Sequence, residues 1–173
     1  MKATDQQSTS PSLPVLEGLL QAMQRMALDH NGLEPVVFFI KDTNVGISPI
    51  GAMGIDMNSA EDKRRLNSII KTACLEQGVD SCILMSEAWL ASIKAEDMEE
   101  KLGGLKDGKV SSLPRSERTE VGLMMLRIFN PTQERWTGTF ELIRDSKGVL
   151  HNFGPVNWMA ERDNAHVTGT LLF

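Results

Sequence analysis

The spacing of apolar residues predicts two amphipathic helices in the first half of the chain. From residue 14 to residue 29, apolar side chains recur at intervals of three and four, so they fall on one face of a helix. Asn31 and Gly32 follow, and both residue types tolerate the left-handed backbone conformation at which many helices end. A second stripe with the same spacing runs over residues 61–77, and Gly78 ends it.

Short apolar runs and alternating segments predict β-strands over the rest of the chain. The first is the run PVVFFI at residues 35–40, and the Gly-rich segment after it suggests a second strand near residues 45–50, paired back on the first. The run VDSCILMSEAWLA at residues 79–91 has the strongest strand pattern. After a polar connection over residues 92–114, we expect strands at residues 120–129, 135–144, 149–153 and 165–173, with the hairpin turn DSKG between the second and third of these.

This order of elements is typical of an α+β protein. We expect a mainly antiparallel sheet with the two amphipathic helices packed on one face. The 173 residues are enough for one domain with a full core, which we place at residues 14–173 after a flexible, polar tail at residues 1–13.

Charge and composition narrow the classes of partner. The net charge of −5 argues against a general affinity for nucleic acid, whose backbone is an array of phosphates. No apolar stretch is long enough to span a membrane, and the N-terminus lacks the apolar segment of a secretory signal. The two cysteines form no C-x-x-C pair, so we expect buried free thiols in a reduced, cytoplasmic protein.

The sequence contains no complete catalytic or metal-binding motif. Its three histidines lack the H-x-x-x-H spacing of a metal site, and no G-x-S-x-G elbow is present for a serine hydrolase. Gly103, Gly108 and Lys109 have the spacing of a phosphate-binding loop, but no hydrophobic strand precedes them and Val110 replaces the required Ser or Thr. We therefore expect no metal and no cofactor, and we lean against an enzyme.

Glu87 is the most informative charged residue, because it stands in the strongest strand pattern. Alternation along a strand places Glu87 and Trp89 on one face with apolar neighbours. A buried carboxylate needs a cationic partner, for which arginine is well shaped. We expect the segment PRSERTE (residues 114–120) to return to this strand and hold Glu87 through Arg115 or Arg118. The four arginines considered as partners are Arg115, Arg118, Arg127 and Arg144.

Such a polar cluster has two interpretations that the sequence leaves open. It is a salt bridge that fixes the register of the sheet, or it is a functional site. The strand SEAW at residues 86–89, followed by a polar loop and the pattern P-x-x-x-R-x-E before a strand, resembles a group of small uncharacterised bacterial and phage proteins. The resemblance covers residues 79–129 and implies no activity. It selects Glu87, Trp89, Arg118 and Glu120 as the residues to test first.

Trp158 is a second candidate for contact with a partner. It lies in the polar segment GPVNWMAERDN, which we expect to be a loop, close to Met159 and Arg162. This composition is typical of a binding hot spot. The alternative is that the indole folds back over the core, and the sequence does not decide between the two.

These patterns support two hypotheses about function. The first is a non-enzymatic, adaptor-like or inhibitor-like protein of phage or mobile-element origin that binds an unidentified protein partner and forms homo-oligomers through a sheet edge or open face. The alternative is a small hydrolase or ligand-binding domain that uses a Glu87/Arg118 polar cluster, with His151 near it and the 94–112 loop above it. A flat, Met-lined apolar surface favours the first, and a polar pocket favours the second. The candidate binding residues are Glu87, Trp89, Arg115, Arg118, Glu120 and Trp158.

Overall fold

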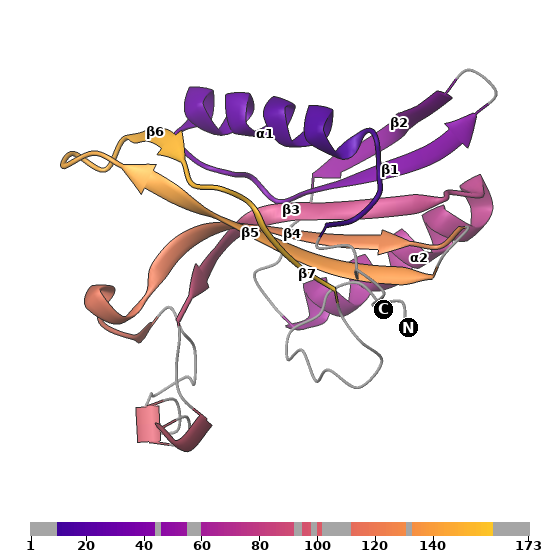
Figure 1. The fold of residues 1–173 in the computed structure, drawn as a ribbon. Helices are drawn as coiled ribbons and strands as arrows, with labels where there is room; N and C mark the ends of the chain where they lie inside the picture. Colours follow the sequence, from indigo (N-terminus) through magenta and orange to yellow (C-terminus); the bar gives the residue numbers. More distant parts are fainter. Residues whose placement is uncertain are drawn as a thin grey trace, which may run out of the picture.

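A seven-stranded antiparallel sheet forms the centre of the computed structural model, with strand order β2-β1-β3-β4-β5-β6 and with β7 paired to β5 (Figure 1). The structure describes residues 10–43, 46–54, 60–91, 95–97, 100–101, 112–130 and 133–160. The helices are α1 (Leu16–His30) and α2 (Ala60–Gln77), with the short 3-10 turns η1 (Ala95–Asp97) and η3 (Arg115–Glu117). The strands are β1 (Val36–Thr43), β2 (Gly46–Gly54), β3 (Ser81–Leu90), β4 (Thr119–Ile128), β5 (Glu134–Arg144), β6 (Leu150–Phe153) and β7 (Asn157–Ala160).

Helix α1 forms where the apolar spacing predicts it. Its buried residues Leu16, Leu19, Met23 and Ala27 are separated by three or four positions, so they make one continuous stripe against the sheet. The helix ends at His30, and the φ of 58° at the capping residue Asn31 lies in the left-handed region. The backbone N–H of Gly32 donates to the Ala27 carbonyl at 2.9 Å, which satisfies one of the free carbonyls at the helix end.

Strands β3 and β4 are the longest continuous pairing in the sheet and position the predicted site residues. Their register runs from Ser81 opposite Ile128 to Leu90 opposite Thr119. The residues of the first six positions of β3 are buried, and the strand becomes exposed toward Leu90. Glu87, the acid of SEAW, therefore lies near the end of β3 at which the strand becomes exposed to solvent.

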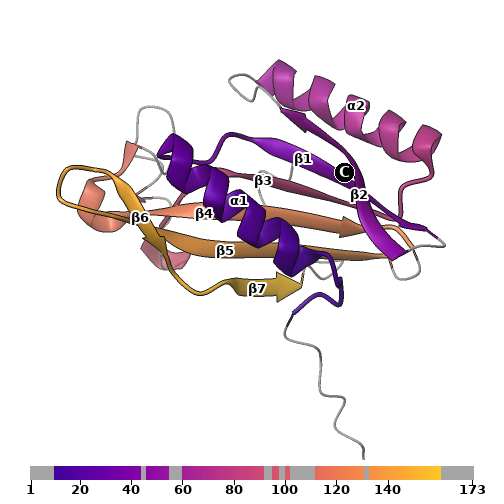
Figure 2. The ribbon, with the colours of Figure 1, turned by 90° about the horizontal axis from the view of Figure 1, so that it is seen from above.

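The α+β architecture is as predicted, but the prediction that both helices pack on one face is wrong. The α1 side of the sheet includes Ile83 and Met85, whereas the α2 side includes Cys82 and Leu84. Because neighbouring residues of a strand point to opposite faces, the buried run CILM requires cover on both sides. Figure 1 shows α1 above the sheet and α2 on its other side, and Figure 2 shows α1 crossing the strands obliquely.

The C-terminal part differs from the prediction at one strand. The segment GPVNWMAERDN, predicted as a loop, contains β7, which pairs with β5 from Thr139 opposite Asn157 to Trp136 opposite Ala160. Its Gly and Pro signals precede the strand, and Asn157, Met159 and Ala160 are all exposed in this four-residue edge strand, so apolar and polar positions do not alternate. The strand predicted at residues 165–173 and the first nine residues of the tail lie outside the described residues.

Asp145 fixes the turn between β5 and β6 and makes this hairpin sensitive to acid. Its Oδ1 accepts the backbone N–H groups of Val149 at 2.9 Å and Lys147 at 2.8 Å. These bonds, that from Val149 foremost, lower the pKa of the Asp145 carboxyl below its usual value. A carboxyl pKa that is lower in the folded chain gives a stability contribution that is full above the usual value of 3.8 and is lost as the pH falls through the lowered value.

We therefore expect Asp145→Asn to reduce the loss of stability between neutral pH and pH about 2, because the amide still accepts hydrogen bonds but does not titrate in this range. Urea unfolding of both proteins at several pH values measures this difference. A carbon-detected NMR titration of Asp145 gives its pKa directly. A titration at the usual carboxyl value, with parallel stability profiles for the two proteins, would contradict the assignment.

Candidate functional site

Glu87 is paired as predicted, but its cation comes from a different strand. Glu87 Oε1 accepts the backbone N–H of Leu33 at 2.8 Å and lies 3.3 Å from Arg144 Nη2. Arg144 is at the end of β5, two strands away from β3 in the sheet. The prediction that the 114–120 segment supplies the guanidinium is therefore wrong. Arg144 was among the candidates, and its long side chain reaches Glu87 by passing Glu120 on the intervening strand β4.

Arg144 connects five parts of the chain. Its Nε and Nη2 bind the two carboxylate oxygens of Glu120 at 2.8 and 2.9 Å, which is the paired geometry that a guanidinium forms with a carboxylate. Its Nη1 lies 3.0 Å from the Asn31 carbonyl oxygen, 3.2 Å from Asn31 Oδ1 and 3.3 Å from the Gly148 carbonyl oxygen. The hydrogen bond to Glu120 raises the pKa of the Arg144 guanidinium, so the cation stays charged. We call Asn31, Glu87, Glu120 and Arg144 the Arg144 network.

The Arg144 network has the geometry of a structural salt bridge. Each of the three nitrogens of the guanidinium donates to a protein acceptor. Asn31 Oδ1 also accepts the N–H of Leu150 at 2.7 Å, which attaches β6 to the end of α1. The side chains of Arg144, Glu120 and Glu87 are 20%, 21% and 32% exposed, so the network is shielded from bulk solvent only in part. Of the two interpretations left open by the sequence, this arrangement favours the one that fixes register.

Arg118 and Trp89 form a separate contact at the open end of β3. The guanidinium carbon of Arg118 lies 4.2 Å from the centroid of the Trp89 ring, which is a cation–π geometry. Trp89 is 38% exposed, and its cross-strand partner is Glu120. Arg115 is exposed on η3. The structure therefore joins Glu87 to Glu120 through Arg144 and places Arg118 on Trp89 beside them.

Trp158 of the edge strand β7 lies against β5. It is half-buried on β7, opposite Gly138 of β5, and it packs against the cluster of buried residues on the α1 side. A Cβ atom added at Gly138 would lie 2.7 Å from the indole ring, so the absence of a side chain there allows the ring to approach. This placement favours the interpretation in which the indole covers the core.

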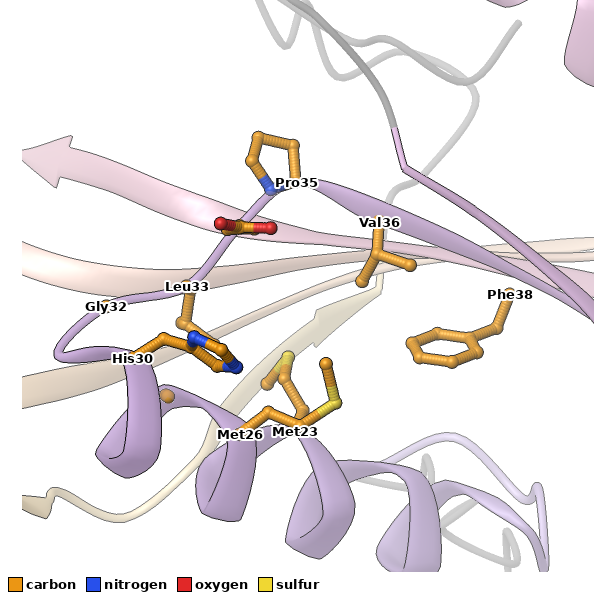
Figure 3. A pocket seen from close by; sticks show the side chains of 10 residues that line it. Met23, Met26, His30, Gly32, Leu33, Pro35, Val36 and Phe38 are labelled. Carbon is orange, nitrogen blue, oxygen red and sulfur yellow. The ribbon is translucent and has the colours of Figure 1, made fainter.

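A pocket between α1 and β1 is the feature that the sequence did not predict. Figure 3 shows Met23 and Met26 of α1 facing Val36 and Phe38 of β1 across it. Its volume is about 150 Å³. Met26 at its mouth is 53% exposed although it is apolar. The lining residues are Met23, Met26, Ala27, His30, Gly32, Leu33, Glu34, Pro35, Val36 and Phe38.

The Arg144 network holds one wall of this pocket. Gly32 and Leu33 line the pocket, and the Leu33 N–H is the group that Glu87 binds. A Cβ atom added at Gly32 would lie 2.8 Å from Glu87 Oε1, so the carboxylate sits directly against the backbone of the α1–β1 connection. Glu87 thus positions one wall of the pocket without being part of its lining.

The lining of the pocket lies within residues 23–38, on the consecutive elements α1 and β1, but no motif in this stretch marks it. The only sequence signal was the high number of methionines, which is ten. Methionine is common at surfaces that adapt to partners, but it is equally common as core filler. Reading the pocket from the sequence would have required knowing which face of α1 meets which strand.

No group of three or more His, Cys, Asp or Glu side chains in the described ranges is arranged to hold a metal ion. Among the helices that the structure describes, none is long and apolar enough to cross a membrane. Comparisons with protein-family models, with curated proteins and with solved structures found no match to this chain.

Proposed function

We propose that the protein binds another protein by accepting one of its apolar side chains in the pocket between α1 and β1. The observation that carries the proposal is the lining itself, in which Met23, Met26, Leu33, Val36 and Phe38 surround an opening to solvent. Clusters of exposed apolar side chains on a soluble domain are typical of contact surfaces.

The volume of the pocket indicates what enters it. Pockets for drug-sized ligands measure roughly 300 to 1,000 Å³, whereas a cavity of about 150 Å³ accepts a molecule the size of benzene. The 150 Å³ pocket is therefore matched to a single leucine, methionine or phenylalanine side chain. Two flexible methionines in the wall allow it to adapt to more than one of these.

An exposed apolar side chain at the pocket extends the proposed contact. Met26 of α1 lines the pocket and is 53% exposed, so a partner that fills the pocket would also cover this side chain. In protein interfaces a few anchor side chains in desolvated pockets supply most of the affinity, and weaker contacts around them exclude water. The pocket would take the anchor, and the exposed face of α1 would supply part of the surrounding contact.

The alternative of a hydrolase or ligand-binding domain built on Glu87 and Arg118 receives less support. Glu87 binds Leu33 and Arg144, whereas Arg118 stacks on Trp89. The two residues thus belong to different contacts. The adaptor or inhibitor role, the phage or mobile-element origin, the cytoplasmic location and homo-oligomerisation remain parts of the proposal that rest on the sequence.

Site-specific photocrosslinking in the native host tests the proposal. A photoreactive phenylalanine analogue at Met26 should give a covalent adduct with a protein partner, because this side chain stands at the pocket mouth. The matched control is the same analogue at Leu75, which is 75% exposed on α2 at the other face of the sheet. We expect mass spectrometry to identify a partner that is attached through position 26 and not through position 75.

A pocket-filling variant shows whether the cavity itself is needed. Val36→Phe adds a ring to the half-buried wall of the pocket and should lower the yield of the position-26 adduct about tenfold, which corresponds to about 1.4 kcal/mol of binding free energy. Circular dichroism and urea unfolding establish that this variant is folded. Identical adducts from positions 26 and 75, or an unchanged yield in folded Val36→Phe, would refute the proposal.

A further inference from the structure

Two cysteine side chains meet on the face of the sheet opposite the pocket. Cys74 of α2 and Cys82 of β3 belong to one cluster of buried side chains between that helix and the sheet. Both are free thiols, and each shifts the pKa of the other, so the two side chains lie close together within this cluster. Two thiols that lie close together on different elements are the arrangement from which an intramolecular disulfide forms.

The surroundings of the two thiols differ. Cys82 is fully buried, whereas Cys74 is 8% exposed and therefore closer to solvent. The interaction between the two thiols lowers the pKa of Cys74 and raises the pKa of Cys82, with burial adding to the second effect. Arg127, the cross-strand partner of Cys82, adds positive charge that favours a thiolate in the pair.

We propose that Cys74 and Cys82 form a redox-active dithiol that a peroxide converts into a disulfide between α2 and β3. The Cys74 thiolate attacks one oxygen of hydrogen peroxide, the O–O bond breaks, and hydroxide leaves to take up a proton and become water, which leaves a sulfenic acid on Cys74. The Cys82 sulfur then attacks the sulfenic sulfur, and its proton leaves with the hydroxyl group as a second water. The dithiol loses two electrons, and the peroxide gains them.

The disulfide would attach α2 covalently to the central part of the sheet. Helix α2 contributes Leu66, Ile70 and Cys74 to its cluster, so the bond would add a covalent link to the packing between α2 and β3, which are consecutive along the chain. The α1–β1 pocket lies on the other face of the sheet. The inference is therefore independent of the proposed function.

Mass spectrometry of the full-length protein tests the dithiol directly. The reduced, folded protein is treated with hydrogen peroxide, then denatured in N-ethylmaleimide and weighed. We expect a monomer about 2 Da lighter than the reduced chain, with both alkylation sites lost and both recovered after dithiothreitol. The chain has two cysteines, so no other thiol contributes to the result.

Single variants show which cysteine reacts with peroxide and which one then forms the disulfide. Cys82→Ser should stop at the sulfenic acid on Cys74, which dimedone traps, whereas Cys74→Ser should react with peroxide at least tenfold more slowly. Peptide mapping of the wild-type protein for a linked Cys74–Cys82 pair gives the same assignment if either variant fails to fold. The proposal is overturned if both thiols remain open to alkylation after peroxide, if the disulfide forms only in urea, or if the main product is a disulfide-linked dimer.

Discussion

Replacing Arg144 with methionine is expected to lower the free energy of unfolding by about 2 to 3 kcal/mol. The variant keeps the length of the side chain but leaves Glu87 and Glu120, which both bind Arg144 Nη2, facing each other without a cation. Breaking a buried ion pair costs about 3 to 5 kcal/mol, and the 20 to 32% exposure of these side chains reduces this figure. Urea unfolding followed by tryptophan fluorescence measures the change.

A matched control separates the network from ion pairs in general. Lys101→Met removes the pair that Lys101 makes with Glu117 at 3.0 Å, where both side chains are about 40% exposed, and we expect no measurable change in the urea midpoint. Arg144→Lys should fall between wild type and Arg144→Met, because an ammonium group cannot bind Glu120 through two nitrogens. Equal stability of Arg144→Met and Lys101→Met would show that the network does not hold the fold.

Loss of Arg144 should also affect the pocket. The carboxylate that binds the Leu33 N–H is held from its other side by Arg144, so the α1–β1 connection is expected to become mobile in Arg144→Met. The corresponding effect would be a weaker position-26 crosslink in a protein that is still folded. Glu87 would then contribute to partner binding by positioning the wall of the pocket and not by contacting the partner.

The sequence was sufficient for elements whose signals are local. Helix α1 was predicted at residues 14–29 and lies at Leu16–His30, because its apolar spacing and its Asn-Gly end are both within the segment. Strand β3 was predicted for the same reason. The prediction that both helices pack on one face was wrong. The continuous buried run CILM in β3 is itself a signal that both faces of the sheet are covered.

The candidate site was only partly accessible to sequence reasoning. That Glu87 needs a cation follows from its position among apolar residues. Which cation it finds depends on strand order, because Arg144 is 57 residues away on a strand that is not adjacent to β3. The pocket lies within residues 23–38, but it depends on how α1 packs against β1, and neither segment alone is unusual.

Gly122→Ala is expected to lower the free energy of unfolding by about 3 kcal/mol, although it adds a single methyl group. Gly122 of β4 is opposite Phe140 of β5, and a Cβ atom added there would overlap the Phe140 ring. Phe140 is only 1% exposed and packs edge-on against Phe153 at 5.8 Å, so the ring has no space into which to move. Overpacking of this kind costs about 1 to 3 kcal/mol, and the rigid ring places this site at the upper end.

Two further variants show whether the loss of stability in Gly122→Ala comes from the overlap with Phe140. Gly18→Ala adds the same methyl group at an exposed position of α1 with no atom within 4 Å, and it should stabilise the protein by about 0.5 to 1 kcal/mol through the helix preference of alanine. In the double variant Gly122→Ala with Phe140→Leu, the smaller side chain gives room for the new methyl group. The two losses should therefore sum to more than the loss of the double variant, and strict additivity in urea unfolding would show that Gly122 is not required by Phe140.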